Sequence, residues 1–291
     1  PTDLYYACLN GSWDLDGDGL FGESELTSSV HRDEVDWIPE VYVGRLPVRT
    51  TKELINIINK TINYNNDPPL LDKILLLSGK THNIYDEDIL LNPMMKTIIP
   101  ENIAVFKLAE GLGNLNEPEI VTALNDNYPL VNWIGHGEHK KLGPLSISSI
   151  NNLTNSIPFL IYAASCYTGA FDGSEDCIGE VLLKKTQGGA IAYIGAVRVA
   201  YHEPFSSIFG LGRELNWQFW KSFFSGNRRI GPTFYDSILN YIKRGVDLRS
   251  ESVRKNLFTY NLLGDPSLII GKKYPYDINI VLQEALSLIH I

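Results

Sequence analysis

The chain has 291 residues, of which 44% are hydrophobic and 20% are charged, a composition typical of a soluble globular protein with a large core. Its formal net charge of −9 argues against a nucleic-acid-binding protein, because no basic stripe is present to neutralise phosphates. No apolar run reaches the roughly 20 residues that a membrane-spanning helix needs, so no membrane span is expected.

An acidic loop follows the first apolar stretch, residues 4–9, which predicts a strand. The loop reads D-x-D-x-D-G and has a glutamate six residues after the glycine, which is the spacing of a calcium-binding loop. The expected ligands are Asp14, Asp16, Asp18, the Leu20 carbonyl and Glu25. Because no paired helices flank the loop, we expect a structural Ca²⁺ ion that rigidifies it. A solvated acidic turn is the alternative, since aspartate and glycine are common in turns.

The next segments predict a β-α-β unit. Residues 39–47 and 73–78 indicate two inner strands, and residues 50–64 between them have the apolar spacing of an amphipathic helix capped by threonine. A helix that connects two strands in this way makes them parallel, with a right-handed crossover. A further strand over 102–107 and a short helix over 117–124 follow.

Two nearly all-apolar runs then end in reactive side chains. Residues 129–134 close in Gly-His136-Gly137, and residues 158–165 run directly into Cys166. Such runs are typical of strands buried on both faces of a parallel sheet, where ligand crevices lie just past the carboxyl ends of the strands. We therefore interpret Cys166 as a nucleophile and His136 as its general base and acid, with the oxyanion bound by the backbone N–H groups of Gly137 and Cys166. A buried core cysteine and a hydrogen-bonded structural histidine are the alternative.

The remainder of the chain predicts further α/β elements. A helix over 176–185 leads to an inner strand over 188–195, two or three helices fill 204–260, and a turn with an edge strand closes the domain at 264–271. The two other cysteines, Cys8 and Cys177, are expected to be free buried thiols, with a disulfide between them as the alternative.

Four segments in order resemble the gingipain-type cysteine peptidases, which share the caspase-like fold. The matching segments are Asn132-Trp-Ile-Gly-His-Gly137, Ala164-Ser-Cys-Tyr-Thr-Gly-Ala-Phe171, Glu40-Val-Tyr-Val-Gly-Arg-Leu-Pro47 and Leu263-Gly-Asp-Pro-Ser-Leu268. The resemblance implies an α/β chain with a caspase-like three-layer αβα sandwich and a mostly parallel central sheet. It also implies endopeptidase activity on protein or peptide substrates, with no organic cofactor.

The resemblance also suggests how the chain is divided. Residues 1–271 would form the gingipain-like catalytic domain, in which 1–70 hold the calcium loop and the first βα unit and 71–271 form the catalytic half. Residues 272–291 would be a tail or the start of a following module. The chain begins at Pro1, so we expect it to be a piece of a longer protein.

A substrate pocket is implied by the same resemblance. In the gingipain pattern, an acid in the loop after strand 73–78 lies in the pocket for a basic P1 side chain, the substrate residue whose carbonyl is attacked. Asp86 and Asp88 are the candidates here, and their alternative role is the acidic first turn of a following helix. In the family, the segment after the strand that corresponds to 188–195 supplies walls of the substrate pocket. Val197, Arg198 and Tyr201 are the candidates here, and ordinary loop packing is their alternative role.

These patterns support three functional hypotheses. The first is a calcium-stabilised cysteine endopeptidase that is secreted to the extracellular space or the cell surface. A propeptide or appended domains outside this segment would be its further partners. The second is a catalytically silent calcium-binding or adhesion module on the same fold. The third is a cysteine hydrolase acting on a non-peptide acyl substrate, since the same groups serve any acyl transfer.

Overall fold

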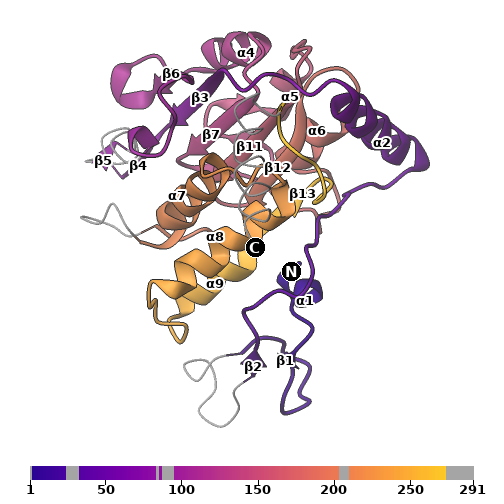
Figure 1. The fold of residues 1–291 in the computed structure, drawn as a ribbon, viewed down its shortest axis with the longest axis vertical. Coiled ribbons are helices and arrows are strands. Elements are labelled where there is room, and N and C mark those ends of the chain that lie inside the picture. The colour runs from indigo at the N-terminus through magenta and orange to yellow at the C-terminus, as the bar shows by residue number, and fades with distance from the viewer. Residues whose placement is uncertain (1, 24–32, 83–84, 87–94, 203–209, 273–291) are drawn as a thin grey trace, which may run out of the picture.

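The computed structural model describes residues 2–23, 33–82, 85–86, 95–202 and 210–272. Within these ranges the chain is built around one six-stranded sheet with the strand order β13-β12-β11-β7-β3-β6 (Figure 1). All neighbouring pairs are parallel except β12 and β13. The strands are β3 (Lys73–Ser78), β6 (Ala104–Ala109), β7 (Leu130–Ile134), β11 (Phe159–Ala164), β12 (Ala190–Ala196) and β13 (Tyr260–Leu263).

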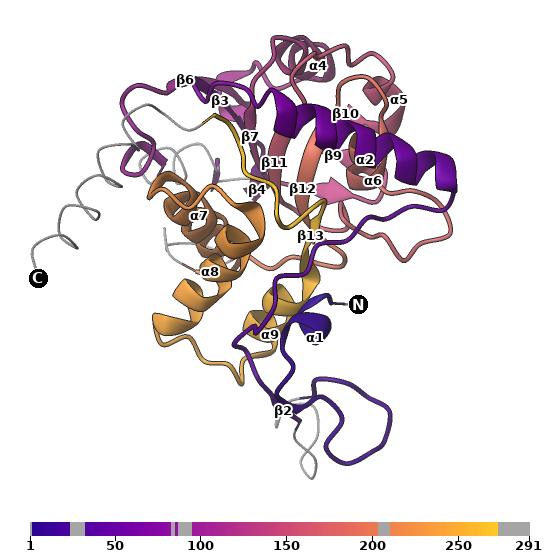
Figure 2. The same cartoon turned by 45° about the vertical axis from the view of Figure 1, so that its right-hand side comes forward.

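Helices cover both faces of this sheet, as Figure 2 shows. One face carries α2 (Thr51–Asn66), α4 (Glu117–Asn125), α5 (Ile147–Ile150) and α6 (Ile178–Lys184). The opposite face carries α7 (Leu211–Phe224), α8 (Ile230–Lys243) and α9 (Glu251–Thr259). Side chains of the same strand belong to two separate cores. In β7, Val131 and Trp133 lie in the core that includes Leu182 of α6, whereas Leu130 and Ile134 lie in the core that includes Phe219 of α7. The predicted three-layer αβα sandwich with a mostly parallel sheet is therefore confirmed.

Local sequence signals explain why several elements form where they were predicted. Helix α2 begins with a capping box, in which the Thr50 hydroxyl accepts the Glu53 N–H at 3.2 Å and the Glu53 carboxylate accepts the Thr50 N–H at 3.2 Å. The inner strands β7 and β11 are buried along their whole length, which is why their sequences are almost entirely apolar.

Three strand predictions were wrong. The stretch from Leu4 forms a helix, α1 (Leu4–Ala7), because Leu4 and Ala7 are three residues apart and share one buried helical face. Residues 39–47 form no strand; only Arg45 bridges the sheet, opposite Leu263, and the first β-α-β unit therefore lacks its first strand. The closing strand lies before the Gly264 turn, at β13, and not over 264–271.

Shorter elements extend from these layers. The strands β1 (Gly11–Ser12) and β2 (Glu34–Val35) form an antiparallel pair. This pair lies at the base of the loop that carries Asp14, Asp16 and Asp18, which is called the aspartate loop below. The others are β4 (Lys80–His82), β5 (Tyr85–Asp86), β8 (Gly137–Glu138), β9 (Lys141–Leu142), β10 (Leu145–Ser146) and the 3-10 turn η1 (Glu110–Leu112). Of the predicted tail, only Lys272 is described. No helix among the described residues has the length and apolar character to cross a membrane.

Candidate active site

The ends of β7 and β11 bring His136 and Cys166 to the same edge of the sheet. These strands are parallel neighbours in a register that pairs Ile134 with Ala164, and the Gly135 N–H donates to the Ala164 carbonyl at 3.3 Å. Each of the two candidate residues lies two positions beyond this last pair. The histidine and the cysteine predicted from sequence therefore leave adjacent strands at the same level, at the carboxyl edge where parallel sheets carry ligand sites.

The loop that carries the histidine packs directly on the turn that carries the cysteine. A Cβ atom added to Gly137 would lie 2.6 Å from Thr168 Cγ2 and 2.7 Å from Ser165 Oγ, so no larger residue fits without a backbone shift. Glycine at this position therefore allows the two loops to approach. The backbone of Gly137 lies against the Ser165–Thr168 turn, next to Cys166.

The residue after the cysteine has an uncommon backbone conformation. Tyr167 has a φ of 58°, in the left-handed region, which costs a non-glycine residue on the order of 1 to 3 kcal/mol. The turn is held in place because the Tyr167 N–H donates to the Arg198 carbonyl at 3.1 Å. The Ala200 N–H in turn donates to Cys166 Sγ at 3.3 Å. The Cys166 thiol also lies 3.6 Å from the Ala200 carbonyl oxygen, so both backbone groups of Ala200 face the sulfur.

All three cysteines are free, and only Cys166 is partly accessible. Burial raises the pKa of Cys8 to about 12, and the charges of Asp36 and Glu40 add to that effect. Burial likewise raises the pKa of Cys177 to about 12. These two thiols therefore stay protonated at neutral pH, as the prediction of free buried thiols requires. Cys166 is therefore the one of these three thiols that is open to solvent.

The segment after β12 lies beside the cysteine turn, as its sequence position predicted. Arg198 and Tyr201 line a hollow of about 720 Å³ on the side of this segment that faces α1 and α9. Val197 is fully buried against Ala170 and Cys177 and is not among the residues that line the hollow. The geometry thus brings two of the three predicted wall residues to a pocket and places the third in a small apolar core.

The two acids predicted for the P1 pocket follow strand β3 in the sequence. Asp86 ends β5 and pairs with Lys80 of β4 through the backbone. Asp88 lies outside the described residues. The described part of the chain therefore leaves their pocket role as a prediction.

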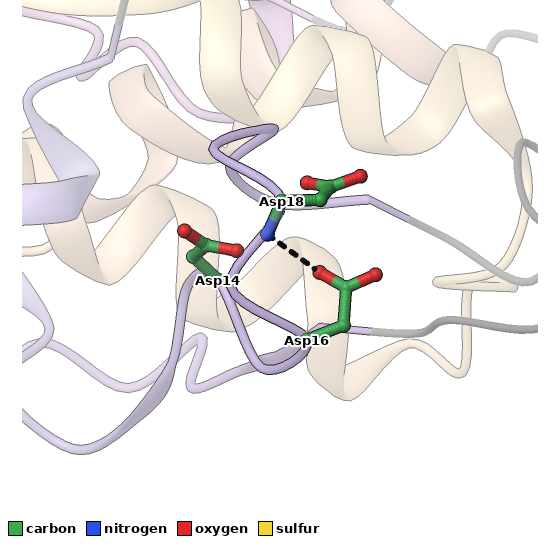
Figure 3. Close-up of side chains that lie close together, drawn as sticks. All are labelled: Asp14, Asp16 and Asp18. Atoms are coloured by element: carbon green, nitrogen blue, oxygen red, sulfur yellow. Dashed lines mark hydrogen bonds between the residues drawn. The ribbon is translucent and has the colours of Figure 1, made fainter.

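The aspartate loop has the geometry of a cation site (Figure 3). Carboxylate oxygens of Asp14, Asp16 and Asp18 lie within 4.8 Å of one another. Two ligands that each lie about 2.3 to 2.6 Å from one Ca²⁺ ion are separated by no more than about 5 Å, so these carboxylates fit one ion. Asp14 Oδ1 is buried and has no hydrogen-bond partner, and such an orphaned oxygen would be satisfied by a cation. Leu20 follows in the same loop, and Glu25 lies outside the described residues.

Two side chains that the sequence analysis missed hold this loop in place. The buried Asp33 carboxylate accepts the Leu15 N–H and the Glu23 N–H, each at 2.7 Å, and so joins the two ends of the loop. Arg254 of α9 donates to the Gly22 carbonyl at 2.6 Å and to the Glu23 carbonyl at 3.0 Å. No local pattern distinguishes either residue in the sequence, because their partners are far away along the chain or are backbone groups.

The sequence model of Peptidase family C25 matches residues 1–270. The chain belongs to peptidase family C25. Among the relatives of this C25 chain, Lys-gingipain W83 of Porphyromonas gingivalis is 26% identical over 213 residues, which cover 69% of the chain and 11% of the relative. Gingipain R2 of the same species is 24% identical over 315 aligned residues, which cover 96% of the chain and 39% of the relative. The C25 chain therefore spans well under half the length of these relatives.

Solved structures show the same architecture. The crystal structure of the Arg specific cysteine proteinase gingipain R matches with a TM-score of 0.65 at 20% identity, over 81% of this chain and 56% of that one. A complex of the pro- and mature domains of Porphyromonas gingivalis RgpB matches with a TM-score of 0.66 at 17% identity, over 87% of this chain and 61% of that one. The C25 chain is thus a gingipain-type cysteine peptidase family member, and the caspase-like fold predicted from its sequence is confirmed.

Proposed function

We propose that this C25 chain is a cysteine endopeptidase domain in which Cys166 and His136 form the catalytic dyad. The observation that carries the proposal is their placement: both leave adjacent parallel strands at the same level, and Cys166 is the accessible thiol. A structural cysteine would be expected to resemble Cys8 and Cys177, which are buried. The strained Tyr167 backbone next to the thiol is a further feature typical of active sites.

The mechanism follows from these positions. The neutral His136 imidazole takes the proton of the Cys166 thiol, and the thiolate attacks the carbonyl carbon of the scissile peptide bond. The backbone N–H groups of Gly137 and Cys166 stabilise the negative charge that develops on the carbonyl oxygen. The His136 imidazolium then donates its proton to the leaving amine as the C–N bond breaks, which leaves a thioester. A water molecule, deprotonated by His136, attacks the thioester, releases the carboxylic acid and restores the thiol.

Covalent labelling tests the dyad. A peptidyl chloromethyl ketone with arginine at P1 should alkylate Cys166 Sγ with loss of chloride in the wild type. It should leave Cys166→Ala unlabelled and label His136→Ala far more slowly. His139→Ala is the matched control, because this histidine lies three residues away in the same loop and should not alter the rate. If folded protein free of any propeptide is not labelled by ketones with any P1 residue, the catalytically silent module is the better hypothesis.

We also propose a preference for arginine or lysine at P1. Two features support it: the relatives are called Lys-gingipain or Arg specific gingipain R, and Asp86 and Asp88 follow strand β3 in sequence. Ketones with arginine, lysine and alanine at P1 should differ in labelling rate, with the basic residues faster. We then test Asp86→Asn and Asp88→Asn separately. The variant whose acid lines the P1 pocket should show a smaller difference in labelling rate between the basic ketones and the alanine ketone. Equal or faster labelling by the alanine ketone would contradict the preference.

A structural Ca²⁺ ion in the aspartate loop is the third part of the proposal. Asp14, Asp16 and Asp18 would bind it through carboxylates, together with the Leu20 carbonyl and Glu25. Calorimetric titration should give a dissociation constant on the order of 10⁻⁴ to 10⁻³ M, the range of extracellular calcium modules. Asp16→Asn should weaken binding, whereas Asp247→Asn, an exposed acid on another loop, should not. Equal heats for the wild type and Asp16→Asn would show that the loop binds no Ca²⁺.

We propose that the domain acts outside the cell or at the cell surface and that a propeptide is one of its partners. If the titration gives the dissociation constant stated above, the loop fills only where Ca²⁺ is abundant. The solved complex of RgpB pro- and mature domains supports a propeptide partner. Fractionation of cells that express the full natural chain should recover the domain in the medium or on the cell surface. Recovery with the intracellular fraction would contradict the localisation.

A further inference from the structure

The hollow next to the cysteine turn has walls of aromatic rings. Its volume of about 720 Å³ lies within the usual range of ligand-binding pockets. The rings come from four separate parts of the chain: α1, the aspartate loop, the segment after β12 and α9. They belong to Tyr5, Tyr6, Trp13, Phe21, Tyr201 and Phe258. Tyr5 contacts both Trp13 and Phe21 edge-to-face, with ring centroids 5.4 and 5.8 Å apart, so the wall is a packed surface.

One wall of the hollow is the segment that contacts the nucleophile. Arg198 and Val199 line the hollow, and the next residue, Ala200, donates its N–H to Cys166 Sγ. The Arg198 carbonyl accepts the N–H of Tyr167 at 3.1 Å. A peptide whose carbonyl carbon reaches Cys166 would lie next to this segment. In an extended peptide each residue advances the chain by about 3.3 Å, so residues close to the scissile bond reach the hollow.

The charges around the hollow are cationic, and each is already paired. Arg45 forms an ion pair with the buried Asp3. Arg198 forms a bidentate ion pair with Asp172, with N–O distances of 2.9 and 2.5 Å. Lys255 forms an ion pair with Glu251. The guanidinium of Arg198 lowers the pKa of Asp172 below its usual value, which keeps that pair charged at neutral pH. Among the described residues, no aspartate or glutamate lines the hollow. A basic side chain would therefore meet three cations and no available acid.

We propose that this hollow is a substrate subsite that binds an aromatic or large aliphatic side chain within three residues of the scissile bond. The inference rests on the peptidase function proposed above. It assigns Arg198 and Tyr201, which were predicted as walls of the substrate pocket, to a subsite that is distinct from the proposed P1 site at Asp86 and Asp88. An apolar side chain gains from burial against the rings. A basic side chain is repelled, and an acidic one finds only cations that already have partners. One missing apolar group in a pocket changes kcat/KM by roughly 10-fold or more, and a whole ring should exceed that.

The aspartate loop supplies part of this subsite. Trp13 and Phe21 line the hollow; Trp13 directly precedes Asp14, and Phe21 lies three residues after Asp18. Phe21 is 59% exposed, so its ring can be removed with little effect on the core. Ile55 of α2 is 50% exposed and does not line the hollow, which makes it a matched control. Tyr6 of α1 offers a second, separate position on the wall.

A peptide library tests the subsite. Arginine or lysine is fixed at P1, the three residues before it and the residue after it are varied, and kcat/KM is measured for the wild type, Phe21→Ser, Tyr6→Ser and Ile55→Ser. We expect one varied position at which phenylalanine or leucine exceeds lysine and aspartate by about 10-fold or more. That preference should shrink in Phe21→Ser and Tyr6→Ser but not in Ile55→Ser, with folding of each variant checked by circular dichroism.

The outcomes separate the subsite from the catalytic function. If the wild type cleaves the library but no position favours apolar residues, the subsite is refuted and the peptidase function stands. An apolar preference that survives unchanged in both folded wall variants would place it elsewhere on the protein and would also refute the subsite. If the wild type cleaves no peptide and is not labelled at Cys166, both proposals are wrong.

Discussion

Replacing Asp33 should loosen the aspartate loop more than any change at an exposed aspartate. Its side chain is 4% exposed and accepts two backbone N–H groups, from Leu15 and Glu23, at 2.7 Å each. A hydrogen bond to a charged group contributes about 1.5 to 3 kcal/mol, so losing both costs roughly 3 to 6 kcal/mol. Part of the loop is exposed and its N–H groups can bind water, so we expect a value near the lower end, about 3 kcal/mol.

Two measurements check this value. At about 2 °C per kcal/mol for a chain of this size, Asp33→Ala should lower the midpoint of thermal unfolding by about 6 °C if the loop unfolds with the whole domain. If the loop opens locally instead, hydrogen exchange at the Leu15 and Glu23 amides should accelerate by about 100-fold, the equivalent of about 3 kcal/mol, while the midpoint stays constant. Asp33→Asn should have a smaller effect than Asp33→Ala, because its amide oxygen still accepts one N–H while its amide nitrogen cannot accept the other.

The control is Asp36→Ala, which removes a single exposed hydrogen bond from the Ile38 N–H and should change stability by less than about 1 kcal/mol. The reasoning is refuted if Asp33→Ala keeps both the wild-type midpoint and the wild-type exchange rates. It is also refuted if the two variants behave alike.

Three further predictions concern buried polar groups and the proposed calcium site. Burial lowers the pKa of Lys60 to about 7, so between about pH 7 and 10 the unfolded chain holds a proton that the folded chain lacks. The free energy of unfolding should therefore rise with pH in this range. Urea unfolding midpoints measured across the range should show this rise in the wild type and not in Lys60→Met. The Asn132 side-chain oxygen accepts hydrogen bonds from Asn216 at 2.6 Å and from Trp220 at 2.9 Å, and all three groups are buried. Asn132→Leu leaves both donors without an acceptor, so it should lower the free energy of unfolding, measured with denaturant, by about 2 to 5 kcal/mol. Addition of 10 mM Ca²⁺ to chelator-treated protein should stabilise it by about 1.4 kcal/mol for a dissociation constant near 1 mM, and this gain should be absent in Asp14→Asn.

The sequence predicts the centre of the fold better than its edges. Strands β7 and β11 are buried on both faces, so their sequences are almost continuously apolar and their ends are sharp. Residues 39–47 also look like a strand in sequence, but among them only Arg45 forms a β-bridge to the sheet. The sequence pattern alone does not show whether a neighbouring strand is available. The stretch at Leu4 is too short for the helical period to be distinguished from the strand period.

The same physical limit applies to the site. His136 and Cys166 can be predicted because each follows its own strand directly, so local sequence determines where they lie. The hollow cannot be predicted in this way, since Trp13 and Phe258 meet only through tertiary packing, with ring centroids 5.6 Å apart. Arg254 and Asp33 bind backbone groups of the loop, and a backbone partner leaves no trace in the sequence.

The bridge between Arg45 and Leu263 affects how the domain is completed during synthesis. The Arg45 N–H donates to the Leu262 carbonyl, and the Asp3 N–H donates to the Asn261 side chain. The amino-terminal segment therefore cannot dock until almost the whole domain has left the ribosome, roughly 10 to 40 s after Arg45 at ordinary translation rates. Since that segment forms one wall of the hollow beside the cysteine turn, the hollow stays incomplete until residues 261–263 have been made.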